Sequence, residues 1–240
     1  MTRTTVVTGG GTGIGKAVAA RFAADGDQVV LIGRRADVLE KAAAEIGGTA
    51  LPADLSEPAE AERVRADLAG RFGGIDVLVN NAGGNVERTG THEGVVDRWS
   101  GNFRANVLTA VLPTEALRDL LNPSGRVVFV SSIAALRGSG GSSYGPMKAA
   151  LHPYAFDLAA ALGPRGITVN VVAPGLIEDT EFFGGTLSDE RRATLVAQTH
   201  TGRAGSPQDV AETVHWLASP GAGHITAQII QVSGGAERGR

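Results

Sequence analysis

Residues 8–15 read TGGGTGIG, and they decide the fold because of what lies on either side of them. The short apolar run Thr4–Thr8 predicts a strand before the glycines, and the pattern of Ile14–Ala24 predicts a helix after them. Glycine permits the sharp turn between two such elements and lets the backbone approach a ligand closely. Free N–H groups at the start of a helix attract a pyrophosphate. The stretch therefore predicts a phosphate-binding turn between a strand and a helix.

The spacing of the glycines narrows the choice of phosphate-binding motif. The dinucleotide pattern G-x-G-x-x-G, read from Gly9, requires a glycine where Ile14 stands. The triphosphate-binding pattern G-x-x-x-x-G-K-[ST] matches from Gly10 to Lys16 but fails at Ala17, which lacks the hydroxyl that holds Mg²⁺. The pattern that fits in full is T-G-x-x-x-G-x-G, at Thr8, Gly9, Gly13 and Gly15.

Short apolar runs alternate with longer helical patterns along the rest of the chain. Most runs are almost wholly apolar, as expected for parallel strands buried on both faces. The alternation predicts an α/β fold, a Rossmann-type doubly wound parallel sheet flanked by helices, with residues 1–240 as a single domain. The other predicted strands are Gln28–Ile32, Thr49–Ala53, Val77–Asn80, Arg126–Val130, Thr168–Val172 and Gln228–Val232. The other predicted helices are Ala36–Ile46, Pro58–Phe72, Phe103–Leu121, Ser142–Leu162 and Pro207–Leu217.

The composition argues against several classes of protein. The 240 residues carry a formal net charge of −3, which argues against nucleic-acid binding. No apolar run reaches the ~20 residues of a membrane span. The chain has no Cys, which excludes disulfides and thiolate metal sites, and its five His lack the spacing of metal ligands, so we expect no metal site. The first residues show no signal-peptide pattern, and we expect the protein in the cytoplasm.

Further motifs lie on the loops after the later predicted strands. Asn80-Asn81-Ala82-Gly83 follows the fourth strand, Tyr144-x-x-x-Lys148 the fifth, and Pro174-Gly175 the sixth. With the glycine-rich loop, this order resembles the short-chain dehydrogenase/reductase family in its compact single-domain branch, and is similar to 3-oxoacyl-[acyl-carrier-protein] reductases. The resemblance covers essentially the whole chain. It implies binding of NAD(H) or NADP(H) and interconversion of a carbonyl and an alcohol.

Tyr144 and Lys148 are four residues apart, so they lie on one face of a helix. A free tyrosine has a pKa near 10 and is a poor base at neutral pH. An ammonium about 5 Å away contributes roughly 3 kcal/mol toward ionisation at an effective dielectric constant near 20, although burial acts against it. We therefore expect Lys148, aided by the charge of an oxidised nicotinamide, to lower the pKa of Tyr144, which exchanges a proton with the substrate oxygen.

The resemblance supplies the other members of the catalytic group. It implies that Lys148 also binds the nicotinamide ribose, and that Asn106 positions a water molecule linked to Lys148. A purely structural role inside a helix is the alternative for Asn106. A hydroxyl after the fifth strand can polarise the substrate oxygen. The resemblance assigns that role to Ser132, but its gap to Tyr144 is one residue shorter than usual, so Ser131 stays an alternative.

The end of the second predicted strand bears on the choice of cofactor. A carboxylate there would accept hydrogen bonds from the adenosine ribose and repel a 2′-phosphate, but the position is Gly33. Arg34 and Arg35 follow, and a guanidinium offers a planar fork to a phosphate. We therefore expect NADP(H) to be preferred over NAD(H). The alternative is that both arginines are solvated surface charges.

The resemblance also implies which other residues surround the cofactor. Asp54 would contact the adenine edge, and the segment from Asn81 to Gly83 would line the adenine-ribose side. After Pro-Gly the family places Ile and Thr two residues apart, whereas Ile177 and Thr180 are three apart, which makes Thr180 the weaker candidate. The full predicted set, besides Arg34 and Arg35, is Gly9, Thr12, Gly13, Ile14, Gly15, Asp54, Leu55, Asn81, Ala82, Gly83, Tyr144, Lys148, Pro174, Gly175, Ile177 and Thr180.

The substrate side carries less information. Phe182-Phe183 followed by Gly184-Gly185 is interpreted as a lid with an apolar face, or as a contact between subunits. Nothing there names a substrate beyond a small-molecule carbonyl or alcohol, and 3-oxoacyl thioester reduction is an analogy. A nucleotide-binding redox sensor or scaffold without turnover is the alternative function, although such proteins often lose the Tyr or the Lys. A P-loop triphosphatase is a further alternative.

Two expectations concern the helices Phe103–Leu121 and Ser142–Leu162. The resemblance implies that they form a bundle between subunits, in a homotetramer or a homodimer. Pro153 lies inside the second helix and is expected to kink it more than a turn beyond Lys148.

Overall fold

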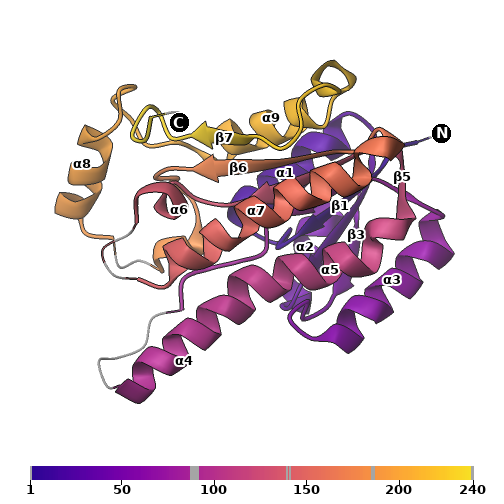
Figure 1. Cartoon of the computed structure of the whole chain (residues 1–240), viewed down its shortest axis with the longest axis horizontal. Coiled ribbons are helices and arrows are strands. Elements are labelled where there is room, and N and C mark those ends of the chain that lie inside the picture. Colours follow the sequence, from indigo (N-terminus) through magenta and orange to yellow (C-terminus); the bar gives the residue numbers. More distant parts are fainter. Residues whose placement is uncertain (1, 87–91, 139, 141, 185–186, 239–240) are drawn as a thin grey trace.

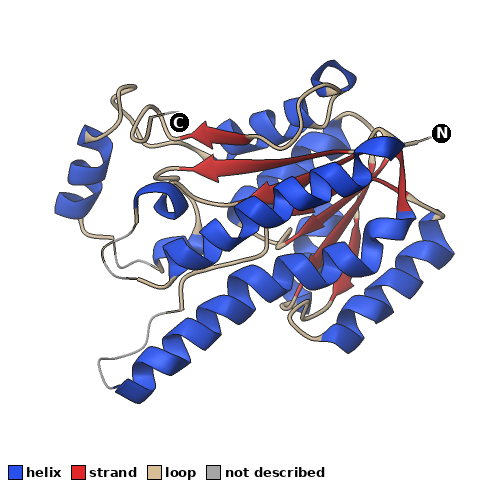
Figure 2. Ribbon diagram, viewed as in Figure 1, coloured by secondary structure: helices blue, strands red, loops and turns tan. Residues whose placement is uncertain are grey.

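A single seven-stranded sheet forms the centre of the protein. The computed structural model describes residues 2–86, 92–138, 140, 142–184 and 187–238. The strand order is β3-β2-β1-β4-β5-β6-β7, and every neighbouring pair is parallel (Figures 1 and 2). This confirms the predicted Rossmann-type, doubly wound parallel sheet. The strands are β1 (Thr4–Thr8), β2 (Gln28–Gly33), β3 (Thr49–Pro52), β4 (Ile75–Asn80), β5 (Leu121–Val130), β6 (Thr168–Pro174) and β7 (Ile229–Val232).

Helices cover both faces of the sheet. One face packs against α1 (Gly13–Ala24), α2 (Ala36–Ile46) and α9 (Pro207–Leu217). The other packs against α3 (Pro58–Phe72), α5 (Thr109–Leu117) and α7 (Tyr144–Leu162). The remaining α-helices are α4 (His92–Phe103), α6 (Ala134–Arg137) and α8 (Asp189–Ala197). A π-helical turn spans Arg104–Leu108, and 3₁₀ turns span Arg118–Leu120, Gly163–Arg165, Glu181–Phe183 and Pro220–Ala222.

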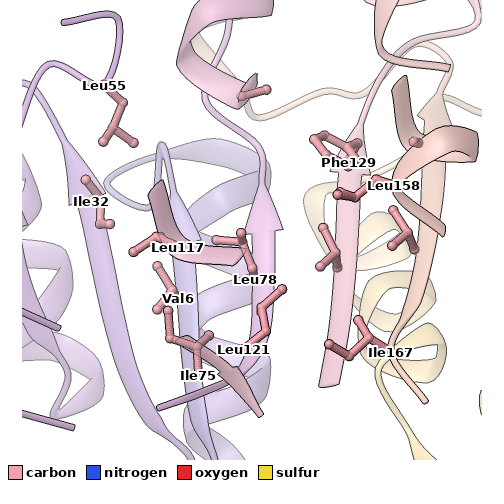
Figure 3. Close-up of a cluster of buried hydrophobic side chains, with 14 of the residues drawn as sticks. Val6, Ile32, Leu55, Ile75, Leu78, Leu117, Leu121, Phe129, Leu158 and Ile167 are labelled. Atoms are coloured by element: carbon pink, nitrogen blue, oxygen red, sulfur yellow. The ribbon is translucent and has the colours of Figure 1, made fainter. Parts of the chain in front are cut away.

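Each face of the sheet has its own apolar core, because the strands are apolar on both sides. Figure 3 shows the core under α3, α5 and α7, where Val6, Leu78 and Phe129 of three different strands are fully buried. The opposite core places Phe22 of α1 against the sheet. Burial of both faces fixes the strands at the centre of the molecule, so that only their ends reach the surface.

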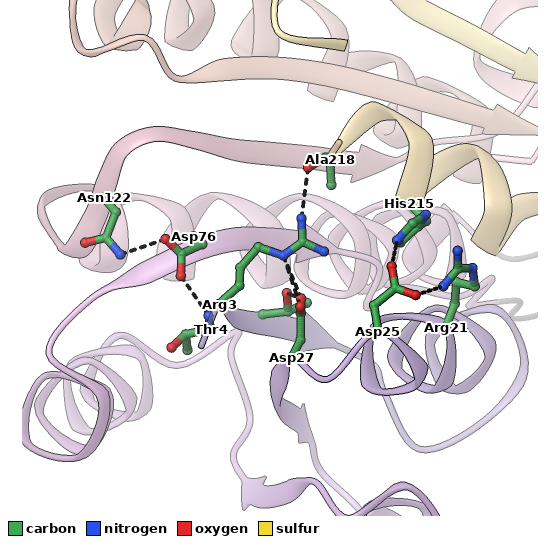
Figure 4. A network of polar contacts seen from close by, with 10 residues as sticks. Arg3, Thr4, Arg21, Asp25, Asp27, Asp76, Asn122, His215 and Ala218 are labelled. Carbon is green, nitrogen blue, oxygen red and sulfur yellow. Dashed lines mark hydrogen bonds and ion pairs between the residues drawn. The ribbon is translucent and has the colours of Figure 1, made fainter. Parts of the chain in front are cut away.

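Polar side chains tie the amino ends of the strands together. Asp76 accepts a hydrogen bond from the backbone N–H of Thr4 at 2.7 Å and another from Asn122 at 2.8 Å, which links β1, β4 and β5. Arg3 forms an ion pair with Asp27 at 2.9 Å (Figure 4). These contacts lie at the opposite end of the strands from the glycine-rich loop.

The boundaries of several elements differ from those predicted. The helix predicted over Phe103–Leu121 is instead the end of α4, a π-helical turn, α5 and a 3₁₀ turn, and Leu121 already belongs to β5. The helices α4, α6 and α8 were not predicted. The prediction for α7 was nearly right, since the helix begins at Tyr144 rather than Ser142, and it runs without a break through Pro153. Among the described residues, no helix combines the length and hydropathy that a membrane crossing requires.

Candidate active site

The loops that carry the predicted motifs meet at the carboxyl ends of the strands. The chain runs outward from β1 to β2 and β3 in one direction, and from β4 to β7 in the other. Ligands bind at such a reversal in open α/β sheets, here between the neighbouring strands β1 and β4. The glycine-rich loop follows β1 and the Asn81 segment follows β4, so the two predicted binding motifs lie side by side.

The glycine-rich loop is shaped by close backbone contacts. Gly9 and Gly13 have φ values of +65° and +51°, a region that residues with a side chain rarely adopt. A Cβ on Gly15 would lie 2.2 Å from the carbonyl oxygen of Gly9, so only glycine fits there. Thr8 Oγ1 accepts hydrogen bonds from the backbone N–H groups of Asn81 and Ala82, both at 3.0 Å. Thr8 therefore links the glycine-rich loop to the Asn81 segment, at the point where the strand order reverses.

The start of α1 fits the pyrophosphate of a dinucleotide. Thr12 is the N-cap residue, but its side chain does not cap the helix, and the first turn contains no acidic residue. The described part of the chain therefore places no side-chain anion on the first N–H groups of α1, around Ile14. Such groups bind phosphate oxygens well.

The described residues contain no group of three or more His, Cys, Asp or Glu that could hold a metal ion.

The predicted catalytic side chains come together where the loop after β5 meets the start of α7. Tyr144 is 9% exposed at the start of α7, and its hydroxyl is hydrogen-bonded to Ser132 after β5. Lys148 lies one turn further along α7, with its Nζ 5.9 Å from the centre of the Tyr144 ring. The Lys148 ammonium also donates to the carbonyl oxygen of Val130 at 2.9 Å.

Burial dominates the pKa values of both α7 side chains. It raises the pKa of Tyr144 above its ordinary value, and the hydrogen bond from Ser132 only partly opposes this. Burial also lowers the pKa of Lys148 to about 8. In the protein alone, Lys148 thus does not produce the lowered tyrosine pKa that we expected. Desolvation penalises the charged form of both groups, which is the tyrosinate of Tyr144 and the ammonium of Lys148.

The two serines after β5 have different surroundings. Ser131 is buried, and its hydroxyl donates to the carbonyl oxygen of Lys148 at 3.1 Å and lies 2.8 Å from Nε2 of His152. Ser132 is the serine that contacts Tyr144. The structure therefore places Ser132, the preferred candidate, at the tyrosine, and it places Ser131, the alternative, against α7 at Lys148 and His152.

Asn106 lies in the π-helical turn and is fully buried. Its amide donates to the carbonyl oxygen of Gly84 at 2.8 Å and accepts from the backbone N–H of Gly84 at 3.1 Å. A Cβ on Gly83 would lie 2.7 Å from Asn106 Oδ1 and 2.8 Å from Lys148 Nζ. The absence of a side chain at Gly83 thus lets the Asn81–Gly83 segment lie directly against both groups.

The predicted adenosine end combines two arginines with two carboxylates. Asp54 accepts hydrogen bonds from the backbone and side chain of Ser56, and Leu55 beside it is buried. Burial acts to raise the pKa of Asp54, but these bonds and the charges of Arg34 and Arg104 outweigh it and hold the pKa below its usual range. Arg35 instead forms an ion pair with Glu181, at 2.6 Å.

The segment after β6 brings Thr180 to the glycine-rich loop. Thr180 Cγ2 lies 3.3 Å from where a Cβ on Gly13 would stand. Asp179, directly before Thr180, takes a left-handed φ of +56°. Ile177 is buried in the core beside α9. In the preceding Pro174-Gly175, the carbonyl of Pro174 accepts a hydrogen bond from the N–H of Ile133, and the N–H of Gly175 donates to the carbonyl of Val232 in β7.

The predicted lid lies over the tyrosine. The ring centre of Phe182 is 5.1 Å from that of Tyr144, and Phe183 packs against Phe182 at the same distance. Gly184 ends this turn with a φ of +53°. Gly185, the second glycine of the predicted hinge, lies outside the described residues.

Sequence reasoning missed three residues at this edge of the sheet. Asn102 is fully buried and binds Val86 of the β4 loop and Ser143 before α7. Its spacing of four from Asn106 was a signal that both lie on one helix face. His152 and Glu181 carried no such signal, because each acts through a partner that is distant in sequence.

Comparison with known proteins assigns the family. The family model described as enoyl-(acyl carrier protein) reductase matches residues 9–237. The chain is 34% identical over 236 residues to 3-oxoacyl-[acyl-carrier-protein] reductase FabG of Escherichia coli, covering 96% of this chain and 95% of FabG.

Solved structures of similar fold support the same family assignment. A short-chain dehydrogenase/reductase from Brucella melitensis, of the glucose/ribitol dehydrogenase type, is 31% identical with a TM-score of 0.88, covering 99% of this chain and 97% of that chain. Levodione reductase is 26% identical with a TM-score of 0.90, covering 97% and 96%. The chain therefore belongs to the short-chain dehydrogenase/reductase family, and it is an oxidoreductase that acts on a CH–OH or carbonyl group.

Proposed function

We propose that this oxidoreductase interconverts a carbonyl and a secondary alcohol with NADP(H), using Tyr144 as the general acid and base. The observation that carries the proposal is the group formed by the buried Tyr144 and Lys148 and the half-buried Ser132, in which the two hydroxyls are hydrogen-bonded and the ammonium lies beneath the ring. A nicotinamide, when bound, supplies or accepts the hydride. Residues of the glycine-rich loop and the Asn81–Gly83 segment would hold it.

The chain's own residues suit the reduction. Burial keeps Tyr144 protonated at neutral pH, so its hydroxyl has a proton to donate to the carbonyl oxygen. Ser132 can donate a hydrogen bond to the same oxygen and stabilise the charge that develops on it. Lys148, with a pKa of about 8, is mainly protonated near pH 7 and supports the tyrosinate left behind. Asn106 holds the Gly84 backbone beside this group.

The proposal also covers the choice of cofactor and the class of substrate. Arg34 and Arg35 at the end of β2 support a preference for NADP(H), since no carboxylate stands at Gly33. A 3-oxoacyl thioester is the substrate class we propose, supported by the likeness to FabG. Retention of both Tyr144 and Lys148 argues against a sensor or scaffold without turnover.

A second copy of the chain is the partner we propose, in a homotetramer or homodimer. α4 exposes large apolar side chains, and α7 beside it exposes Phe156. The cytoplasmic location stays a prediction from the sequence.

Substitution of the tyrosine tests the proposal. Tyr144→Phe removes the proton donor, and kcat/KM for a 3-oxoacyl thioester with NADPH should fall by about 10²- to 10⁴-fold. The matched control is Tyr154→Phe on the same helix, whose hydroxyl donates to Glu115 away from the site. Turnover of Tyr144→Phe near that of the control would rule out the proposed acid.

A further inference from the structure

The turn from Thr180 to Gly184, here called the crossing turn, contacts both ends of the candidate site. At one end Glu181 binds Thr12 and Arg35, and at the other Phe182 packs on Tyr144. We infer that Glu181 is a specificity-determining residue that competes with a cofactor phosphate for Arg35. The inference rests on the proposed function, since it takes Arg35 as a phosphate ligand.

The contact uses the part of Arg35 that a phosphate would use. Arg35 Nη2 donates to Glu181 Oε2 at 2.6 Å, and Nη1 donates to Oε1 at 3.3 Å. This paired geometry is the one by which a guanidinium binds either a carboxylate or a phosphate. A phosphate that takes both donors must therefore displace the Glu181 carboxylate.

The carboxylate is charged and easily displaced. Arg35 holds the pKa of Glu181 below its usual range, so Glu181 is ionised at neutral pH. The side chains of Arg35 and Glu181 are 55% and 59% exposed, and exposed ion pairs are weak. Thr12 Oγ1 adds one long hydrogen bond to the carboxylate, at 3.3 Å. Glu181 thus reduces the affinity for a phosphate at Arg35 without excluding it.

Displacement of Glu181 also affects the catalytic end of the site, where Phe182 covers Tyr144. Phe182 directly follows Glu181, and its ring lies against the Tyr144 ring. Release of Glu181 from Arg35 frees the anchored end of the crossing turn, whose other end is the left-handed Gly184. A ligand that carries a phosphate at Arg35 therefore loosens the cover over Tyr144, whereas one without that phosphate leaves the anchor in place.

Fluorescence titration with NADPH and with NADH tests the inference. In Glu181→Gln the ratio of the NADH Kd to the NADPH Kd should rise about fivefold over wild type, chiefly through tighter NADPH binding. The matched control is Glu178→Gln, which breaks the exposed ion pair of Glu178 with Arg192 on the same segment and should leave the ratio within twofold. An unchanged ratio in Glu181→Gln, or an equal rise in the control, would overturn the inference.

Two further variants separate this inference from the proposed function. Arg34→Ala tests the NADP(H) preference itself, because Arg34 is not paired with Glu181. If wild type fails to prefer NADPH and Arg34→Ala changes neither Kd, the proposed cofactor is wrong, while the shift in Glu181→Gln is still measured against wild type. In an Arg35→Ala background the Glu181→Gln shift should disappear. Its full persistence there would show that Glu181 does not act through Arg35.

Discussion

His152 is a buried titratable residue directly behind the candidate catalytic group. Burial lowers the pKa of its imidazole below the ordinary value, while unfolding restores that value. The unfolded chain therefore takes up a proton that the folded protein resists, and stability falls as the pH drops below about 6.5. Neutral His152 makes its full contribution to the free energy of unfolding above about pH 6.5. That contribution is lost as the pH falls from about 6.5 to the lowered pKa of the folded protein.

This predicts a pH-dependent difference between two histidine variants. His152→Gln should reduce the fall in the free energy of unfolding between about pH 6.5 and 5, by up to about 1.4 kcal/mol per pH unit. Denaturant titrations at several pH values measure it. The exposed His224→Gln is the control and should follow wild type. Parallel curves for all three proteins would contradict the prediction.

The residues predicted at this scale were those whose partners are near in sequence or fixed by a motif. Tyr144 and Lys148 are one helical turn apart, and the structure places them together. The surroundings of Ser131 and Ser132 depend on His152 and the fold of the β5 loop, so sequence could only rank them. In the protein without a nicotinamide, burial raises the pKa of Tyr144, and the extent of that burial depends on the whole packed structure. The predicted lowering by Lys148 together with an oxidised nicotinamide stays a prediction.

At the scale of elements, α7 contains Pro153 in its interior, as α5 contains Pro113. The helix continues across this residue, although proline has no N–H to donate to the carbonyl of Ala149. Pro153 is exposed, so its ring contributes little to the core. The cost is therefore the missing hydrogen bond, within a helix that tertiary contacts hold in place.

Pro153→Ala should stabilise the protein by about 1–3 kcal/mol, because it restores that hydrogen bond. Denaturant unfolding at neutral pH measures the change, and turnover should stay near wild type because Lys148 is more than a turn away. The control is Pro220→Ala, at the first position of a 3₁₀ turn where proline is well tolerated. Loss of stability in Pro153→Ala would show that the proline ring makes contacts worth more than the bond.

The predicted helix over Phe103–Leu121 shows why element boundaries were less accurate than element types. Gly94 and Gly101 weaken the helical pattern before Phe103, yet α4 begins at His92. Asn102 and Asn106 bind the loop after β4, and these tertiary contacts outweigh the low propensity. The alternation of strands and helices was predictable because it depends on long runs of residues rather than on single ones.

At the scale of the molecule, α4 presents an apolar face that stays exposed in the described part of the chain. Val96, Trp99 and Phe103 are 64%, 43% and 43% exposed. If this face joins copies of the chain, Trp99→Glu should shift the protein to a smaller species in sedimentation velocity at micromolar concentration. Ala44→Glu, on the exposed side of α2, is the control and should sediment as wild type. Identical profiles for both variants would exclude α4 from the interface.

The sheet was the most predictable feature of the whole molecule. All seven strands were placed from their apolar runs, and their order follows from right-handed crossovers and one reversal between β1 and β4. The crossing turn was not predictable in the same way. Its position depends on contacts of Glu181 and Phe182 with two separate loops and with the start of α7.

The position of β1 has a consequence for synthesis on the ribosome. Thr5–Val7 pair with Val77–Val79, so β1 lacks its second neighbour until β4 has left the exit tunnel. Until then a nascent sheet of β1, β2 and β3 would leave β1 as an unpaired edge strand, which is a template for aggregation. Slow translation between β1 and β4 would prolong that exposure.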